Sequence, residues 1–171
     1  MIFSVFAFVT LIISICIKNR KKSLCIQSLS CLFESFYSFF ISAYTGAMLN
    51  LISFIRSFLF MNKEKFNKKI YFIMLILFEV VIISNCIYTW NGLISLLPTI
   101  GSVIRTYCLW QSNMKYVRLS GITTGITYGT YYLYYKGWFM VLGYVVLLII
   151  GIWQFFINDI KKQKWVWINS F

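Results

Sequence analysis

Four ionisable side chains lie inside long apolar stretches of this sequence, where charge is uncommon. They are Glu34, Arg56, Glu79 and Arg105. An ionised side chain costs roughly 2.5–3.5 kcal/mol near the centre of a membrane helix, so such residues are candidates for a functional role. Because an arginine side chain can extend several ångströms along the membrane normal, Glu34 could pair with Arg56 on a neighbouring segment. In the same way, Glu79 could pair with Arg105, and either glutamate is a candidate for proton transfer.

The two arginines also admit a simpler interpretation. Arg56 and Arg105 each lie about five residues from the end of an apolar segment, or roughly 8 Å along a helix. An arginine at that depth can extend its side chain to the membrane surface without any functional partner. The sequence leaves this interpretation open beside an ion pair or an anion-binding site.

A polar stripe accompanies these charges in the segment that contains Arg56. Asn50, Ser53 and Ser57 follow one another at spacings of three and four residues, which places them on one face of a helix. Two interpretations are open. The stripe could bond to a neighbouring helix, at about 0.6 kcal/mol per contact. It could instead face a solute, with Asn50 as the strongest candidate because its amide both donates and accepts.

Several kinds of chemistry have no residues to support them. The chain has no histidine, which excludes Ser/His/Asp catalysis and histidine-ligated metals. Its five cysteines show no C-x-x-C spacing, and no glycine-rich phosphate-binding motif is present. We therefore expect no enzyme activity, no cofactor and no metal.

The composition indicates the class of protein. Of the 171 residues, 60% are hydrophobic and only 12% are charged. A soluble domain of this size needs a more polar surface, so the sequence predicts a membrane protein. The lipid bilayer is then the expected partner, and the formal charge of +12 does not indicate nucleic-acid binding.

Cutting the chain at charged and turn-forming residues predicts seven membrane-spanning helices in an all-α fold. These segments are Ile2–Ile17, Leu24–Ile41, Thr45–Met61, Ile70–Tyr88, Gly92–Trp110, Leu119–Tyr135 and Gly137–Ile157. Basic residues follow the first segment rather than precede it, which favours a retained helix over a cleaved signal peptide.

The basic residues predict the orientation of these helices. Thirteen of the sixteen fall in the first, third and fifth connections or in the C-terminal tail, whereas Lys136 alone lies on the opposite side. Positive charge collects on the cytoplasmic side of membrane proteins. We therefore expect the N-terminus outside the cell and the C-terminus in the cytoplasm.

A weak internal repeat appears when the second half is moved by about 94 positions onto the first. This shift aligns Asn50 with Tyr144 and Tyr44 with Trp138. The repeat predicts two three-helix bundles, residues 1–61 and 90–158. Residues 62–89 supply a loop and a linker helix that makes the bundles parallel, and residues 159–171 form a cytoplasmic basic and aromatic tail. A solute site is expected on the axis between the bundles.

The candidate residues for this site come from both bundles. Tyr128, Trp138 and Tyr144 would supply aromatic surface opposite the polar stripe. The complete set of substrate-binding candidates is Asn50, Ser53, Arg56, Tyr128, Trp138 and Tyr144. Glu34, Glu79 and Arg105 are the remaining buried-charge candidates.

Two stretches, Ser42–Phe60 and Trp90–Ile157, resemble the YgjV family of bacterial inner-membrane proteins. The plan of three, one and three helices is similar to that of the SWEET, PQ-loop and PnuC carriers. By analogy, this resemblance implies small-solute transport in the inner membrane, and it implies binding roles for Asn50 and Tyr144. PQ-loop carriers use prolines as hinges, which implies that role for Pro98, although the first half has no equivalent proline.

Two expectations about function remain open from sequence. The first is a protein that binds or moves a small solute, alone or as a homo-oligomer. The alternative is a non-transporting membrane scaffold or immunity-type protein, in which the buried charges serve only topology and assembly.

Overall fold

A computed structural model describes residues 2–17, 19–62, 66–111, 114–154 and 156. Regular structure in these ranges is helical, without a strand. The helices are α1 (Ile2–Cys16), α2 (Arg20–Phe40), α3 (Tyr44–Met61), α4 (Lys68–Tyr88), the 3-10 helix η2 (Leu93–Ser95), α5 (Leu96–Trp110), α6 (Met114–Tyr134) and α7 (Trp138–Gln154). The prediction of an all-helical chain with seven α-helices is confirmed for this part of the chain. The predicted tail, residues 159–171, lies outside the described residues.

α2 and α6 begin four and five residues earlier than predicted, because a helix can continue past the end of its apolar segment. α2 begins at Arg20 rather than at Leu24. The side chain of Asn19 caps it by accepting hydrogen bonds from the backbone N–H groups of Lys21 (3.0 Å) and Lys22 (3.4 Å). Similarly, α6 begins five residues before the predicted Leu119. Charged residues avoid the hydrocarbon layer, but they are compatible with helical backbone.

The start of α5 is later than predicted. Gly92 adopts a φ of 75°, a conformation that suits glycine, and the 3-10 helix η2 follows it. α5 then begins at Leu96, so that Pro98 lies in its first turn. The missing N–H of a proline interrupts no hydrogen bond within the helix at this position. The hinge role of Pro98 remains a prediction.

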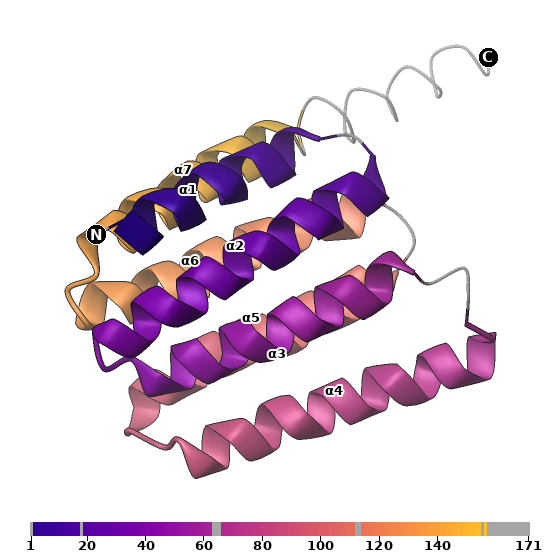
Figure 1. Ribbon diagram of the computed structural model, residues 1–171, viewed down its shortest axis with the longest axis horizontal. Helices are drawn as coiled ribbons and strands as arrows, with labels where there is room; N and C mark the ends of the chain where they lie inside the picture. Colours follow the sequence, from indigo (N-terminus) through magenta and orange to yellow (C-terminus); the bar gives the residue numbers. More distant parts are fainter. Residues whose placement is uncertain (1, 18, 63–65, 112–113, 155, 157–171) are drawn as a thin grey trace.

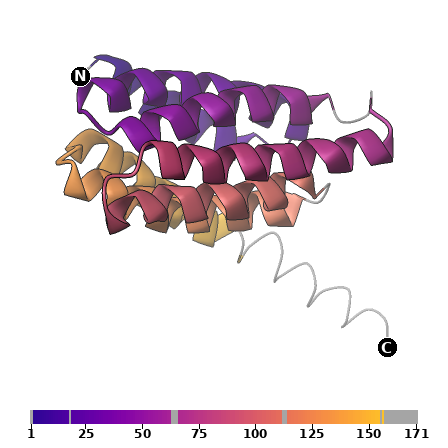
Figure 2. The same ribbon diagram turned by 90° about the horizontal axis from the view of Figure 1, so that it is seen from below.

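Six of the helices form two layers that face each other (Figure 1). One layer contains α1, α2 and α3 side by side, and the other contains α7, α6 and α5 in the same lateral order. α1 packs on α7 and α3 packs on α5. Figure 2 shows α4 along the common edge of the layers, where it contacts α3 and α5. Sequential helices run in opposite directions, so all connections end at one of two faces.

The outer surface of this bundle is apolar, whereas much of its interior is polar. Large hydrophobic side chains such as Ile73, Ile87, Leu142 and Ile149 are exposed. By length and composition, α3, α4 and the segment Leu93–Trp110 can cross a membrane. α1 and α7 contain shorter apolar stretches. α2 and α6 are 21 residues long but more polar, and they are the middle helices of the two layers.

The two layers share a regular spacing along the chain. α1, α2 and α3 begin at residues 2, 20 and 44, and α5, α6 and α7 begin at residues 96, 114 and 138, which is 94 residues later in each case. The turns follow the same rule. The two non-glycine residues with positive φ among the described residues are Ser42 (60°) and Lys136 (56°), also 94 positions apart.

Close packing between α6 and α7 depends on Gly125. A Cβ atom at this position would lie 2.5 Å from Leu148 Cγ and 3.2 Å from the carbonyl oxygen of Tyr144. One turn earlier, a Cβ at Gly121 would meet only Leu147 Cδ2, at an ordinary 3.7 Å. The two glycines of the same helix therefore differ in the space available to a methyl group.

We expect Gly125→Ala to lower the midpoint of thermal unfolding in detergent, because overpacking costs about 1–3 kcal/mol. Gly121→Ala is the matched control. It should leave the midpoint unchanged or raise it, since alanine is favoured over glycine within a helix by up to about 1 kcal/mol. Equal midpoints for the two variants would show that α6 and α7 are not this close.

Candidate functional site

Glu34 is the centre of a buried hydrogen-bond network between the two layers. It lies in the second half of α2 and is only 2% exposed. Ser30, one turn earlier on the same helix, donates to Oε1 (3.1 Å). Tyr144 on α7 donates its hydroxyl to Oε2 (2.6 Å). A carboxyl group buried in this way is stabilised by its donors, so the bond from Tyr144 ties the two layers together.

A second group of polar side chains lies beside Glu34. The hydroxyl of Tyr132 on α6 is 2.5 Å from Ser38 Oγ on α2, and it accepts a hydrogen bond from Asn50 Nδ2 on α3 (3.0 Å). The ring of Tyr132 stacks on that of Tyr144, with centroids 5.7 Å apart and an interplanar angle of 16°. α2, α3, α6 and α7 therefore meet at one polar and aromatic cluster.

Arg56 lies in the same interior, closer to the opposite end of α3, and is completely buried. Its guanidinium group donates to the hydroxyl of Ser53 (3.1 Å), to the carbonyl oxygen of Ser102 (3.3 Å) and to the hydroxyl of Thr106. Among the residues that the structure describes, its Nε has no hydrogen-bond partner. Arg56 therefore does not extend to the surface, because α5 holds its guanidinium group inside the protein.

Arg105 is the second buried guanidinium group, and it crosses from α5 to α2. When the amide of Gln27 is oriented with its oxygen toward Arg105, that oxygen accepts a hydrogen bond from the guanidinium group, with Nε 3.0 Å away. Arg105 also interacts electrostatically with Glu34 and with Arg56, at distances longer than a hydrogen bond. In the described part of the chain, Glu34 makes no direct bond to Arg56, and Glu79 makes none to Arg105. Arg105 is the basic residue that acts on Glu34, and Arg56 acts on Glu79.

The structure separates Glu79 from the other buried charges. It lies on α4, at the edge of the layers, and is partly exposed. Its Oε2 atom is buried without a hydrogen-bond partner. Glu79 is therefore a neighbour of the central network and does not belong to it.

Five of the six predicted substrate-binding residues lie in the buried interior. Asn50 and Ser53 belong to the predicted stripe on α3, whose third member Ser57 is also buried; Arg56 lies on the same helix, and Tyr144 contacts Glu34. The hydroxyl of the fifth residue, Tyr128, is 2.6 Å from Ser102 Oγ.

The sixth predicted residue, Trp138, is not part of this interior. It is 62% exposed, because it begins α7 at the end of the bundle.

Several residues of the network were not predicted. Tyr132 and Ser38 share a hydrogen bond beside Glu34, Thr106 accepts one from Arg56, and Gln27 faces Arg105. The sequence contained a signal for two of these residues, because Ser38 and Tyr132 are 94 positions apart and the repeat aligns them. These two aligned residues touch where α2 of one layer meets α6 of the other.

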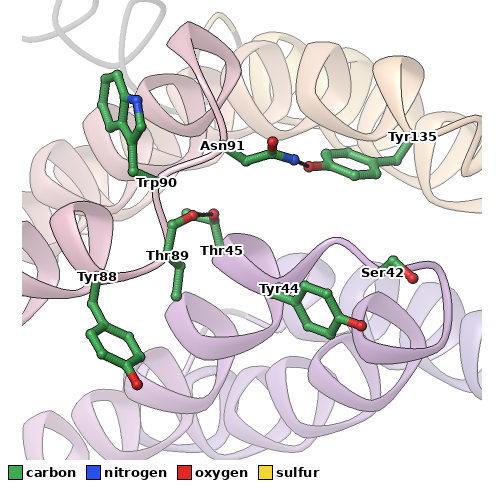
Figure 3. A pocket seen from close by; sticks show the side chains of 8 residues that line it. All are labelled: Ser42, Tyr44, Thr45, Tyr88, Thr89, Trp90, Asn91 and Tyr135. Carbon is green, nitrogen blue, oxygen red and sulfur yellow. Dashed lines mark hydrogen bonds between the residues drawn. The ribbon is translucent and has the colours of Figure 1, made fainter.

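A pocket of about 370 Å³ opens at the end of the bundle that carries Ser42 and Lys136 (Figure 3). It is lined by Ser42, Tyr44, Thr45, Tyr88, Thr89, Trp90, Asn91 and Tyr135. Its wall is fixed by hydrogen bonds from Thr45 Oγ1 to the carbonyl oxygen of Thr89 (2.8 Å) and from Asn91 Nδ2 to the hydroxyl of Tyr135 (2.7 Å). The lining is uncharged, aromatic and rich in hydrogen-bonding groups.

The pocket is connected to the central network through Tyr131. Its ring lies 5.0 Å from that of Tyr135 and 5.5 Å from that of Tyr132, measured between centroids. The hydroxyl of Tyr131 accepts a hydrogen bond from the backbone N–H of Gly46 (3.1 Å). A continuous row of tyrosines therefore leads from the pocket to Glu34.

This arrangement can bind a polar molecule but has no set of metal ligands. Within the described residues, no group of three or more His, Cys, Asp or Glu side chains occurs. The available chemistry is hydrogen bonding, aromatic stacking and the positive charge of two arginines.

We expect Tyr144→Phe to destabilise the protein by about 1–3 kcal/mol, because it removes a donor from the buried Glu34 carboxyl group. Thermal unfolding in detergent measures the effect, with the exposed Tyr134→Phe on α6 as the control. In the background of Glu34→Gln, the cost of Tyr144→Phe should fall. An equal cost in both backgrounds would contradict the importance of this bond.

Comparison with known proteins identifies the family of the chain. The sequence profile of the family Imp-YgjV, bacterial inner membrane protein, matches residues 1–126, from α1 into α6. No curated protein and no solved structure matches the chain. The match covers well over half of the sequence, and the apolar helices and exposed apolar surface agree with a location in the membrane. The chain therefore belongs to the Imp-YgjV family of bacterial inner membrane proteins.

Proposed function

We propose that this protein carries a small polar solute across the bacterial inner membrane, between two parallel three-helix bundles joined by α4. The main observation in support of this proposal is the hydrogen-bond network of Glu34, which combines a buried carboxyl group with donors from both layers. Ionisable groups inside membrane proteins mark solute and ion pathways more often than structural sites. Transporters built from related halves bind their solutes where the halves meet.

The spacing of the helices supports the two-bundle arrangement. Each helix of the first layer begins 94 residues before its counterpart in the second layer. The contact of α1 with α7 then corresponds to the contact of α3 with α5, as a twofold relation requires. Ser38 and Tyr132, which are aligned by the same shift, touch at the axis.

The proposed path begins at the pocket of Figure 3 and continues inward along the tyrosines. The bond between Ser38 and Tyr132 closes this path at the axis. A rocking motion of one bundle against the other would break that bond and expose the central network to the opposite end. Asn50 is the proposed solute contact, because its amide can bond to a solute when Tyr132 moves away.

We also propose that all seven helices span the membrane, with the pocket facing outward. α2 and α6 are too polar to be recognised as spans by composition, but their polar faces are covered by the other layer. The basic residues Lys21, Lys22, Lys68 and Lys69 lie at the end opposite the pocket. This distribution supports a cytoplasmic basic end, a cytoplasmic C-terminus and an external N-terminus.

Transport can be tested in proteoliposomes with a panel of labelled sugars, amino acids, nucleosides and organic acids. We expect accumulation or counterflow of at least one solute class, and a loss of about tenfold in initial rate for Asn50→Ala, equivalent to about 1.4 kcal/mol. Asn67→Ala is the matched control, because Asn67 is exposed and makes no side-chain cap bond. Absence of flux across the panel would favour the non-transporting scaffold, in which Glu34→Gln changes expression alone.

Orientation can be tested separately with side-specific reporters. A reporter that is active only in the cytoplasm should be active after Lys65 and inactive after Lys136. A periplasmic reporter at the same two positions should give the opposite result. Same-side signals at both positions would contradict the proposed topology.

A further inference from the structure

Two buried arginines lie between the layers, and neither bonds directly to a carboxyl group of the residues that the structure describes. Arg56 is 0% exposed and Arg105 is 9% exposed. Arg56 bonds to Ser102 and Thr106, the α5 residues on either side of Arg105 along the chain. The two guanidinium groups also interact electrostatically with each other. Both arginines are therefore held at the same stretch of α5, Arg56 through its hydrogen bonds and Arg105 as a residue of that helix.

The acceptors of these groups are all uncharged. Within the described part of the chain, the guanidinium hydrogen bonds go to the side chains of Ser53, Thr106 and Gln27 and to the carbonyl oxygen of Ser102. Arg56 Nε has no acceptor although it is buried. Buried cations are normally paired with an anion, because their desolvation is costly. The two arginines are therefore suited to binding a negatively charged group, which no side chain among the described residues provides by direct contact.

The nearby carboxyl groups do not fill this role by direct contact. Both oxygens of Glu34 are engaged by Ser30 and Tyr144. The Oε2 atom of Glu79 is buried without a donor, just as Arg56 Nε is buried without an acceptor. These two unsatisfied atoms do not bond to each other, so Glu79 balances the charge of Arg56 only at longer range.

We propose that Arg56 and Arg105 form a binding site for the oxyanion group of a solute, a carboxylate or a phosphate. A guanidinium group presents its N–H donors in a plane that matches two oxygens of such a group. An oxyanion would bond to Arg56 Nε and replace some of the neutral acceptors. The inference rests on the proposed function for the identity of the ligand as a transported solute, but binding itself does not require transport.

The position of the site supports access from the basic end of the bundle. Arg56 and Arg105 lie five residues from the last residues of α3 and α5, or roughly 8 Å along each helix. Lys21, Lys68 and Lys69 lie at that same end. A cluster of charges of the same sign raises the local concentration of oppositely charged solutes. Anions would therefore be drawn toward the two arginines.

The test measures thermal unfolding of the purified full chain in detergent, titrated with inorganic phosphate, with acetate, with chloride and with glucose at constant ionic strength. We expect a saturable rise in the midpoint with phosphate or acetate, and no comparable rise with chloride or glucose. The two oxyanion titrations distinguish a phosphate-bearing solute from a carboxylic acid. If none of the titrants raises the midpoint, or chloride does so equally, the inference is overturned.

Variants locate the binding within the protein. Arg105→Gln should weaken the apparent affinity at least tenfold, and Arg56→Lys should weaken it because the charge remains but the planar donors are lost. Lys69→Gln is the matched control, since it removes one positive charge at the same end and should change the affinity less than twofold. Equal weakening in all three would assign the effect to surface charge and overturn the inference.

The result of this binding experiment can be distinguished from the result of the transport assay. Oxyanion binding without flux of any solute would support the site and contradict transport. Flux of neutral solutes that phosphate and acetate do not inhibit, in a protein that neither oxyanion stabilises, would contradict the site and leave transport intact.

Discussion

The interior of this protein is organised by the need to satisfy a buried carboxyl group inside a bundle whose outer surface is apolar. Glu34 has one donor on its own helix and one on α7. The second donor is available only when the two layers face each other in register. The close approach of α7 to α6 at Gly125 helps to place Tyr144 at this distance. Packing and polar bonding are therefore mutually dependent.

The same constraint explains why the two middle helices have unusual compositions. α2 carries Gln27, Ser30, Glu34 and Ser38 along the face that meets the other layer. The facing helix α6 carries tyrosines, whose rings fill apolar space while their hydroxyl groups form hydrogen bonds. A helix in the middle of a layer is covered by neighbours on both sides. It can therefore hold polar groups that an edge helix such as α4 would expose to lipid.

Sequence reasoning predicted the helices and one face of the site, because these depend on local patterns. Charge and turn residues mark the ends of apolar runs, and a spacing of three and four residues places Asn50 and Ser53 on one side of α3. The partners of the arginines were harder to predict. Whether Arg56 meets Glu34 or Thr106 depends on which helices face each other across the layers, and one-dimensional spacing does not contain that information.

The position of Trp138 outside the buried interior has a related cause. Alignment with Tyr44 was correct in register, since both residues lie at the same end of corresponding helices and both are exposed. An aromatic residue at a helix end, however, is placed at the surface of the bundle, where rings of this kind prefer the interface. The alignment of the two halves alone does not show which of the aligned residues lie in the middle of the bundle and which lie at its ends.

The shared register also reveals an asymmetry in the chemistry. A shift of 94 positions places Glu34 opposite Tyr128, Arg56 opposite Ile150 and Arg105 opposite Leu11. Each of these charged residues thus has an uncharged counterpart, although the helices and turns correspond closely. Corresponding backbones permit two equivalent arrangements of the bundles, which the proposed rocking motion requires. Unequal side chains give the proposed site a carboxyl group on one side and guanidinium groups on the other, so that a solute with one charged group would bind in a single orientation.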